Sequence, residues 1–193
     1  MALVRLPIKG YGQLELNNVF FRREGAIEAQ CALDPDDFAV EGEATTKDAT
    51  EGKIYCENGM LLAVDKAAGL IRLPSGDDEV LPIALVYSTE HMYDERKKGL
   101  KDFYLPAGTF YPRMGYPKIG EIWTTNCFSV AEDDVDGIEN AITNNTPVYG
   151  TFCEQGTVKL TLTKPETKLV LKVVKKTTMP DGSEAAKLQV IKA

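Results

Sequence analysis

Residues 157–193 read TVKLTLTKPETKLVLKVVKKTTMPDGSEAAKLQVIKA, and this stretch decides the fold class. Apolar and polar residues alternate in it twice, at residues 158–162 and again at residues 169–173. Successive side chains of a strand point to opposite faces, so a period of two indicates strands with one buried face. Residues 179–183, MPDGS, supply the proline, aspartate and glycine typical of a turn. The stretch therefore predicts a β-hairpin at the end of the chain.

The residues before this hairpin extend the same pattern. We expect five strands in the C-terminal half, near residues 119–128, 147–152, 157–163, 168–177 and 184–192. The best helix candidate is residues 132–145, because its acids fall in the first turn, at the positive end of the helix dipole. Short strands at this spacing are typical of a small barrel or sandwich.

The N-terminal half gives weaker strand signals. Residues 12–33 predict a first hairpin that turns at Glu24-Gly25, and Asn58-Gly59 between two apolar runs is a strong hairpin signal. Another turn is expected at residues 66–69, followed by strands in LIRLP and VLPIALVYS. We therefore predict an all-β protein, mainly β with one short helix, built as small barrel or sandwich modules from antiparallel hairpins. Residues 1–116 would form an N-terminal β-rich region and residues 117–193 a C-terminal region resembling a small β-barrel.

Two segments of the N-terminal region differ from the strands around them. Residues 34–51 carry seven acids against one lysine, with few apolar anchors and no alternation, so we expect a loop or an arm. A mobile surface loop is slightly favoured over an arm that reaches toward a neighbour. Residues 103–117 combine aromatic residues with three prolines, which exclude long regular structure. We expect this second segment to be pinned against the body and to offer a contact surface.

Charge is distributed unevenly along the chain. The formal net charge is −7, while residues 157–193 hold eight lysines against three acids and so carry +5, which leaves −12 on the first 156 residues. An acidic body repels nucleic acid, so we expect none as a partner. No apolar run approaches the roughly 20 residues of a membrane-spanning helix, and the N-terminal residues do not resemble a signal peptide, so we expect synthesis in a cytoplasm and no membrane partner.

Residues that could carry chemistry are few and scattered. The only histidine, His91, lies in EHMYDERKKGLKDF (residues 90–103), where Glu90 and His91 would point to opposite faces of a strand, so a solvated segment is the better interpretation. Cys31, Cys56, Cys127 and Cys153 match no zinc or redox spacing and are expected to be free and buried.

Other candidate motifs also favour a structural interpretation. Residues 132–143 begin like a calcium loop, but Glu132 stands where Asp is needed and Thr143 where a bidentate Glu is needed. Trp123 sits at an alternating strand position and is expected in the core. An acid pair meeting in space could still hydrolyse a glycosidic bond, although nothing in the sequence supports it. We therefore assign no catalytic, cofactor-binding or metal-binding residue, and expect no enzyme activity and no cofactor.

Four stretches taken together resemble small virion structural proteins of tailed bacteriophages, in particular capsid decoration or auxiliary head proteins. They are GQLELNNVFFRREGAIEAQCAL, ENGMLLAVDKAAGLIRLP, STEHMYDERKKGLKDF and LKVVKKTTMPDGSEAAKLQVIK. The resemblance implies a β-rich protein on the capsid surface of the virion, bound to the major capsid protein in many copies and self-associating, with a trimer as one option.

We expect its contacts at residues 34–51, at residues 103–117 and along the edge of the terminal hairpin. The alternative is a β-barrel binding module of a head fibre or tail component that recognises a host glycan or receptor.

Overall fold

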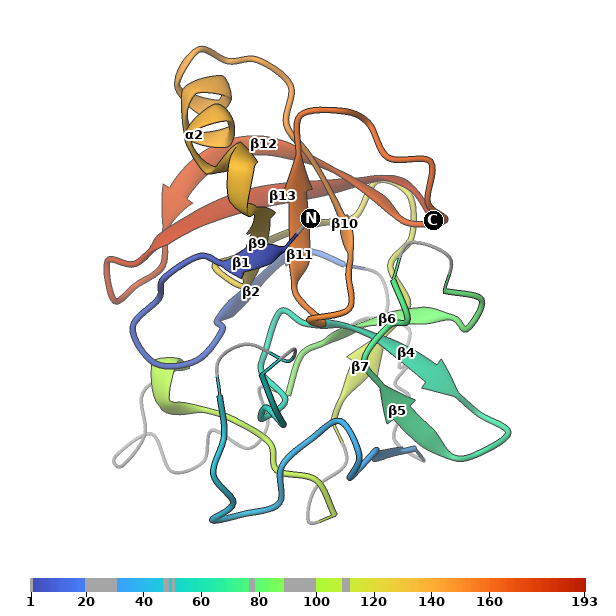
Figure 1. The fold of residues 1–193 in the computed structure, drawn as a ribbon. Helices are drawn as coiled ribbons and strands as arrows, with labels where there is room; N and C mark the ends of the chain where they lie inside the picture. The colour runs from blue at the N-terminus through green and yellow to red at the C-terminus, as the bar shows by residue number, and fades with distance from the viewer. Residues whose placement is uncertain are drawn as a thin grey trace.

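The computed structural model describes residues 2–19, 31–46, 49, 51–76, 79–88, 100–108 and 112–193. The described residues form two β-sheets, and a single short α-helix lies beside the larger one (Figure 1). This confirms the predicted all-β class. The candidate segment around His91 and the turn at Glu24-Gly25 lie outside the described residues.

The larger sheet has eight strands and curls into a half-barrel (Figure 1). Its order is β1 (Leu3–Arg5), β9 (Phe128–Ala131), β11 (Val158–Thr161), β10 (Tyr149–Phe152), β12 (Val170–Thr178), β13 (Glu184–Lys192), β8 (Ile122–Thr125) and β2 (Leu14–Asn18). The terminal hairpin is confirmed, because β12 and β13 pair antiparallel and the chain turns between them at residues 179–183.

The smaller sheet has five strands, in the order β3 (Ala32–Leu33), β5 (Leu70–Arg72), β4 (Leu61–Asp65), β6 (Ile83–Val86) and β7 (Met114–Gly115). The expected turn at residues 66–69 is confirmed, since it joins the antiparallel strands β4 and β5. Both sheets are mixed: β3 runs parallel to β5, and β9 runs parallel to β11. Antiparallel hairpins therefore account for only part of the pairing.

The hairpin predicted at Asn58-Gly59 is wrong, although the turn is there. Gly59 takes the positive φ of 90° that a glycine tolerates. The residues before the turn do not pair with β4, however, because Cys56 bridges Leu105 and β4 lies between β5 and β6. The turn of the first predicted hairpin lies outside the described residues, and the described strands that precede and follow it lie in different sheets, with β2 beside β8 and β3 beside β5.

The sequence-based boundary between residues 116 and 117 falls between β7 and β8, which belong to different sheets. The early strands β1 and β2 nevertheless lie in the sheet formed by the C-terminal strands, at its two edges. The chain therefore begins in the larger sheet, passes into the smaller one and returns.

The predicted helix is confirmed as a 3-10 turn, η3 (Glu132–Asp134), that runs into α2 (Val135–Thr143). Ile138 and Ala141 on one face of α2 are buried in the core of the larger sheet. A second 3-10 turn, η2 (Leu100–Asp102), precedes the aromatic segment. No helix within the described ranges has both the length and the apolar character needed to cross a bilayer.

Two apolar clusters form the core. One fills the inside of the larger sheet and includes residues of β4 and β6 from the smaller sheet, and Trp123 is completely buried in it, as predicted for this residue. The other lies on the smaller sheet and gathers Phe38 and Ile54 from outside its strands. The backbone explains why these two residues reach the core, because Phe38 and Ile54 form an isolated parallel bridge that brings the segment of Phe38 against the sheet.

Candidate functional site

The two N-terminal segments expected to make contacts lie side by side at the lower end of the molecule as drawn in Figure 1. Ala107 N–H donates to the carbonyl of Ala39 at 2.8 Å, and Leu105 exchanges two backbone hydrogen bonds with Cys56. Phe38 and Ala39 are fully buried. The expectation of few apolar anchors in residues 34–51 is therefore wrong, because this segment is fixed to the body through its first half.

Three tyrosines from separate parts of the chain meet where these segments join. Tyr55 and Tyr104 stack with ring centroids 4.3 Å apart and planes at 22°, and Tyr11 packs 4.9 Å from Tyr104. Val40 lies beside them, because the hydroxyl of Tyr55 donates to the Val40 carbonyl, and the Val40 side chain is 45% exposed. We call Tyr11, Val40, Glu41, Tyr55 and Tyr104 the tyrosine surface.

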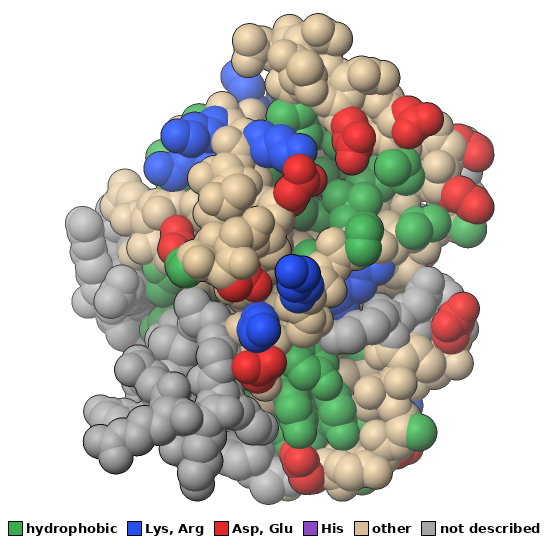
Figure 2. Space-filling model, turned by 90° about the vertical axis from the view of Figure 1, so that its left-hand side faces the viewer, with side chains coloured by type: hydrophobic (Ala, Val, Ile, Leu, Met, Phe, Trp, Pro, Cys, Tyr) green, Lys and Arg blue, Asp and Glu red, His purple; other side chains and the backbone are tan. Residues whose placement is uncertain are grey.

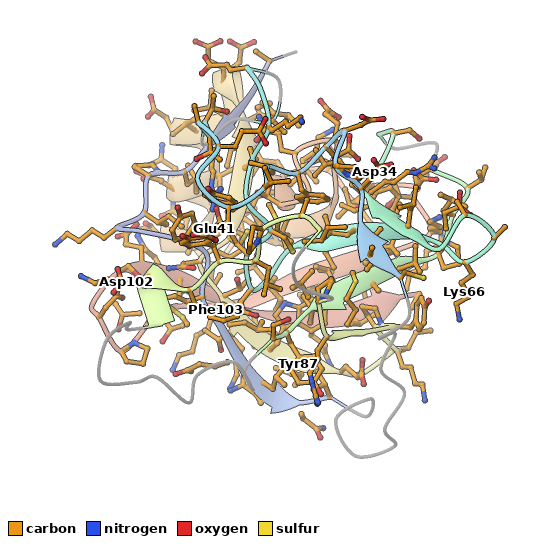
Figure 3. The ribbon with its side chains drawn as sticks, turned by 90° about the horizontal axis from the view of Figure 1, so that it is seen from below. Asp34, Glu41, Lys66, Tyr87, Asp102 and Phe103 are labelled. Carbon is orange, nitrogen blue, oxygen red and sulfur yellow. The ribbon has the colours of Figure 1, made fainter. Side chains whose placement is uncertain are left out.

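The polar groups of the tyrosine surface hold its rings in place. The Tyr104 hydroxyl donates to Glu41 Oε1 at 2.9 Å. This hydrogen bond, together with partial burial and the negative charge of Glu41, raises the pKa of Tyr104 to about 12. Figure 3 looks at this end of the molecule and places Glu41 on the same side as Asp102 and Phe103, away from Lys66. The half-buried rings of Tyr11 and Tyr104, the Glu41 carboxylate and the exposed Val40 side chain thus face solvent, while the Tyr55 ring is buried behind the surface.

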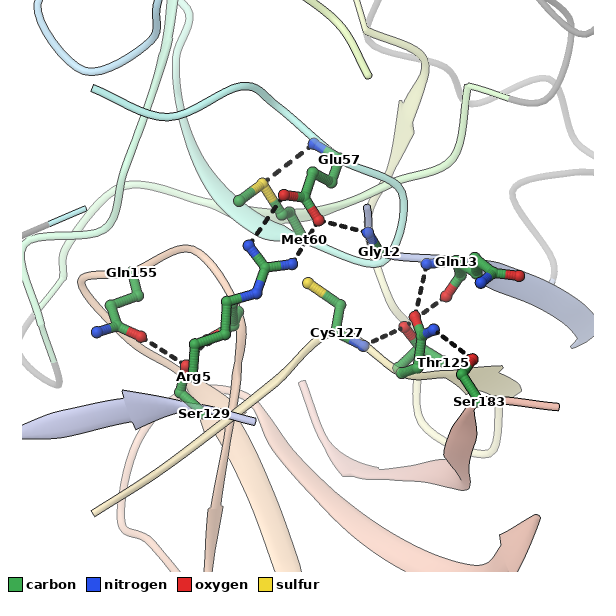
Figure 4. Close-up of polar contacts among 12 residues, drawn as sticks. Arg5, Gly12, Gln13, Glu57, Met60, Thr125, Cys127, Ser129, Gln155 and Ser183 are labelled. Carbon is green, nitrogen blue, oxygen red and sulfur yellow. Dashed lines mark hydrogen bonds and ion pairs between the residues drawn. The ribbon is translucent and has the colours of Figure 1, made fainter. Parts of the chain in front are cut away.

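Tyr11 is positioned by a buried ion pair that joins the two sheets (Figure 4). Arg5 of β1 donates to both carboxylate oxygens of Glu57, at 2.9 Å to Oε1, and Gly12 N–H donates to Glu57 Oε2. The side chains of Arg5 and Glu57 are only 7% and 2% exposed, so each charged group has the other as its partner in place of water. We call Arg5, Gly12 and Glu57 the sheet junction.

Electrostatics and shape both constrain the sheet junction. Burial lowers the pKa of Arg5, but the charge and the hydrogen bond of Glu57, together with the nearby Cys127, outweigh burial and the net shift is upward, so Arg5 stays charged. A Cβ on Gly12 would lie 2.7 Å from the carbonyl oxygen of Asn58, so only glycine fits there. Because Gly12 directly follows Tyr11, whose N–H donates to the Lys101 carbonyl at 2.6 Å, the junction fixes the backbone beneath the tyrosine surface.

Polar side chains next to the sheet junction satisfy one another. Asn126 accepts from Gln13 N–H at 2.7 Å and donates to Ser183 at 3.0 Å, and Ser129 donates to Gln155 at 2.6 Å (Figure 4). Buried polar groups with such partners have a structural explanation, because each is satisfied by hydrogen bonds within the fold.

A hollow lies between α2, the β12–β13 turn and residues 6–9. It has a volume of about 560 Å³. Its walls include Leu6, Ile8, Phe128, Ile138, Ile142 and Leu160, with Lys9, Glu139, Lys176, Asp181 and Glu184 among the charged residues. We call it the α2 groove. The sequence did not predict it, and its lining contains neither an imidazole nor a thiol.

The four cysteines are free and buried, which confirms their interpretation from the sequence. Burial raises the pKa of the Cys56 thiol well above its ordinary value and also raises the pKa of Cys153. Thiols in this state are poor nucleophiles at neutral pH, because the thiolate is the reactive form.

The segment that begins like a calcium loop is helical in the structure. Residues 132–143 form η3 and α2, with Glu132 at the start and Thr143 at the end, instead of a loop that wraps an ion. Within the part of the chain that the structure describes, no three His, Cys, Asp or Glu side chains gather closely enough to hold a metal.

The third expected contact, the edge of the terminal hairpin, does not join the tyrosine surface. The hairpin lies in the larger sheet, at the opposite end of the molecule from residues 34–46 and 103–108 (Figure 1). Sequence reasoning found Tyr104 and Glu41 as parts of expected contact segments but missed Tyr11 and Tyr55. Neither has a local signal, since each reaches the surface only through the pairing of distant segments.

Comparison with known proteins adds no relative. No family model matches the chain, and neither a curated protein nor a solved structure matches it.

Proposed function

We propose that this chain is a non-enzymatic structural protein of a tailed-phage virion. It binds the major capsid protein on the outside of the shell and reinforces the shell as a decoration protein. The tyrosine surface is the observation that carries the proposal on the structural side, and the resemblance of the four sequence stretches supplies the virion context.

The tyrosine surface has the chemistry of a protein contact. Tyrosine is enriched in binding hot spots because it offers a large, stiff, amphipathic area at low cost in conformational entropy. Here two of the rings are stacked at 4.3 Å and Tyr104 is held by Glu41, so little freedom is left to lose on binding. The exposed Val40 adds apolar area that water covers poorly.

The tyrosine surface is already anchored in the folded protein, which supports a binding role for it. Phe38 is buried in the core of the smaller sheet and Gly12 is tied to the sheet junction. The contact region is thus built on the body of the protein, and binding does not have to order it first.

Co-sedimentation with purified empty capsids of the phage that encodes the chain tests the proposal. Tyr104→Ala should weaken capsid binding, whereas Tyr149→Ala, a half-buried tyrosine on β10 in the other sheet, should bind like the unmodified protein. Deletion of residues 34–51 is not a usable test, because it removes Phe38 from the core. Equal capsid binding by both variants, or none by the unmodified protein, would refute the proposal.

The same rings favour one alternative, a binding module of a head fibre or tail component that recognises host glycan or receptor. Tyrosine rings that are partly open to solvent can stack on the apolar face of a sugar, as any aromatic ring can. Binding to host cells or glycans that is lost in Tyr104→Ala, with no binding to shells, would support this alternative over decoration.

A further inference from the structure

Charged side chains separate by sign around α2. Residues 119–158 contain seven acids and no lysine or arginine, and five of these acids fall in residues 132–139. The strand β12 then carries Lys172, Lys175 and Lys176, all exposed. Figure 2 shows acidic side chains gathered on the upper right of this side of the molecule, basic ones on the upper left, and hydrophobic side chains between them.

The acidic side chains surround an exposed apolar residue. Leu162 is 41% exposed, and its Cδ1 would lie 3.3 Å from a Cβ placed on Gly137 of α2. Glu132 and Asp133 are exposed in the turn before Gly137, and Asp136 is exposed next to it. We call Glu132, Asp133, Asp136 and Leu162 the acidic patch.

The basic side chains are arranged in the same way. Val174 is 49% exposed between Lys172 and Lys175, next to a hollow of about 480 Å³ that reaches Ile142 near the end of α2. Lys175 lies directly opposite Lys187 on β13, a placement of like charges that costs stability. We call Lys172, Val174, Lys175 and Lys176 the basic patch.

Most of these charges have no oppositely charged partner among the described residues. Among the described residues, the acids of the acidic patch form no ion pair, and Lys172 and Lys175 form none either, while Lys176 pairs with Glu184 at 2.7 Å. Lysines on a strand edge can also serve only to block strand pairing, and none of the described strands lies beside residues 174–178 of β12 on its β10 side. That explanation covers the basic patch alone and leaves the matching acidic patch unexplained.

We propose that the acidic patch of one copy binds the basic patch of a second copy, with the two α2 helices antiparallel across a two-fold axis. Each patch has an exposed aliphatic centre and a rim of one charge sign, and the signs are opposite. A nine-residue helix is about 13 Å long at 1.5 Å per residue, and the two patches adjoin its two ends. A two-fold axis beside α2 therefore forms both contacts at once, as isologous interfaces do.

The axis places the α2 groove within the interface. Lys176 of the basic patch lines the groove together with Glu139 and Ile142 of α2, so the groove adjoins the basic patch and α2 and supplies apolar area beside them. A polyanion such as nucleic acid fits these observations less well, because the acidic patch and the rest of the acidic chain would repel it. The inference does not depend on the proposed function, since it concerns the purified chain without any shell.

Charge reversal at each patch provides the test, followed by sedimentation velocity at low and high salt. Lys172→Glu with Lys175→Glu should weaken self-association at least about tenfold, a factor that corresponds to about 1.4 kcal/mol. The control Lys66→Glu with Lys101→Glu changes the net charge by the same amount at exposed positions away from both patches and should associate normally. High salt should weaken association of the unmodified protein.

A complementation experiment separates pairing from a general charge effect. Glu132→Lys with Asp136→Lys should also fail to self-associate, but an equimolar mixture with the lysine-reversed variant should form dimers again, because both contacts then join opposite charges. Far-UV circular dichroism confirms that each variant is folded. A monomeric unmodified protein, a trimer, association of the lysine-reversed variant equal to that of its control, or a mixture that stays monomeric would each overturn the inference.

Discussion

Removing Glu57 should destabilise the protein more than any exposed acid, because its partner Arg5 cannot leave the interior. The two side chains are 2% and 7% exposed and joined by two hydrogen bonds. Glu57→Ala leaves a buried guanidinium and an unpaired Gly12 N–H, and loss of one partner of a buried pair costs about 3 to 5 kcal/mol. For a chain of this size that corresponds to a fall in Tm of about 6 to 20 °C.

The double variant Arg5→Met with Glu57→Leu distinguishes a buried charge from lost packing. It removes both ions and leaves the Gly12 N–H without its acceptor, an unsatisfied buried donor that costs about 1 to 3 kcal/mol. The double variant should therefore be more stable than Glu57→Ala alone. The exposed pair Lys176–Glu184 is the control, and Glu184→Ala should cost about 0.2 to 1 kcal/mol.

Urea unfolding followed by circular dichroism and by the fluorescence of Trp123, the only tryptophan, gives the free energies. If Glu57→Ala lies within about 1 kcal/mol of the unmodified protein, then the pair is not buried as described. A double variant less stable than Glu57→Ala would show that packing, and not the uncompensated charge, dominates at the junction.

Three further predictions address the anchoring of the tyrosine surface. Phe38→Ala should cost about 3 to 5 kcal/mol in urea unfolding because its ring is completely buried, whereas a cost typical of a surface loop would contradict the anchoring of residues 34–46. Gly59→Ala should destabilise the fold by more than about 1 kcal/mol in the same assay, since the new Cβ would lie 2.3 Å from Thr125 Oγ1 at a positive φ; an unchanged midpoint would contradict this turn. Ultraviolet titration should show one phenol ionising near pH 12, and the Tyr104→Phe variant should lack it. Because the pKa of Tyr104 is raised in the folded state, the contribution of this phenol to stability should be lost as the pH rises from about 10 to about 12. Ionisation of every tyrosine near pH 10 would show that the Glu41 contact is not formed.

Local pattern was enough to predict elements whose partners are close in sequence. The hairpin of β12 and β13 follows from alternation on both sides of MPDGS, and α2 follows from its acidic first turn. In each case the determining interactions lie within about one element of each other, so periodicity and turn chemistry describe them fully.

Pairings between distant residues could not be predicted in this way. Asn58-Gly59 is a strong local signal for a hairpin, yet Gly59 N–H donates to Val86 and Glu57 pairs with Arg5, 52 positions away. The parallel pairs β3–β5 and β9–β11 likewise have the same alternation as antiparallel ones. Periodicity shows which face of a strand is buried but not which strand lies beside it.

The candidate site shows the same limit. The aromatic composition of residues 103–117 pointed to Tyr104 as part of a contact region, and the acids of residues 34–51 pointed to Glu41. Their hydrogen bond spans 63 positions and depends on the burial of Phe38, which the acidic composition of its surroundings concealed. Tyr11 and Tyr55 reach the surface only because the sheet junction and the bridge at Cys56 bring their segments together.

The most direct measurement of the central claim is a cryo-electron microscopy map of empty tailed-phage capsids, from the phage to which the proposal assigns the chain, mixed with the purified chain. The account predicts added density on the outer surface of the shell, with the end that carries Tyr11, Val40 and Tyr104 in contact with the major capsid protein and with no added density for a Tyr104→Ala sample. Shells without added density, or density that contacts the shell through α2 and the terminal hairpin, would contradict it.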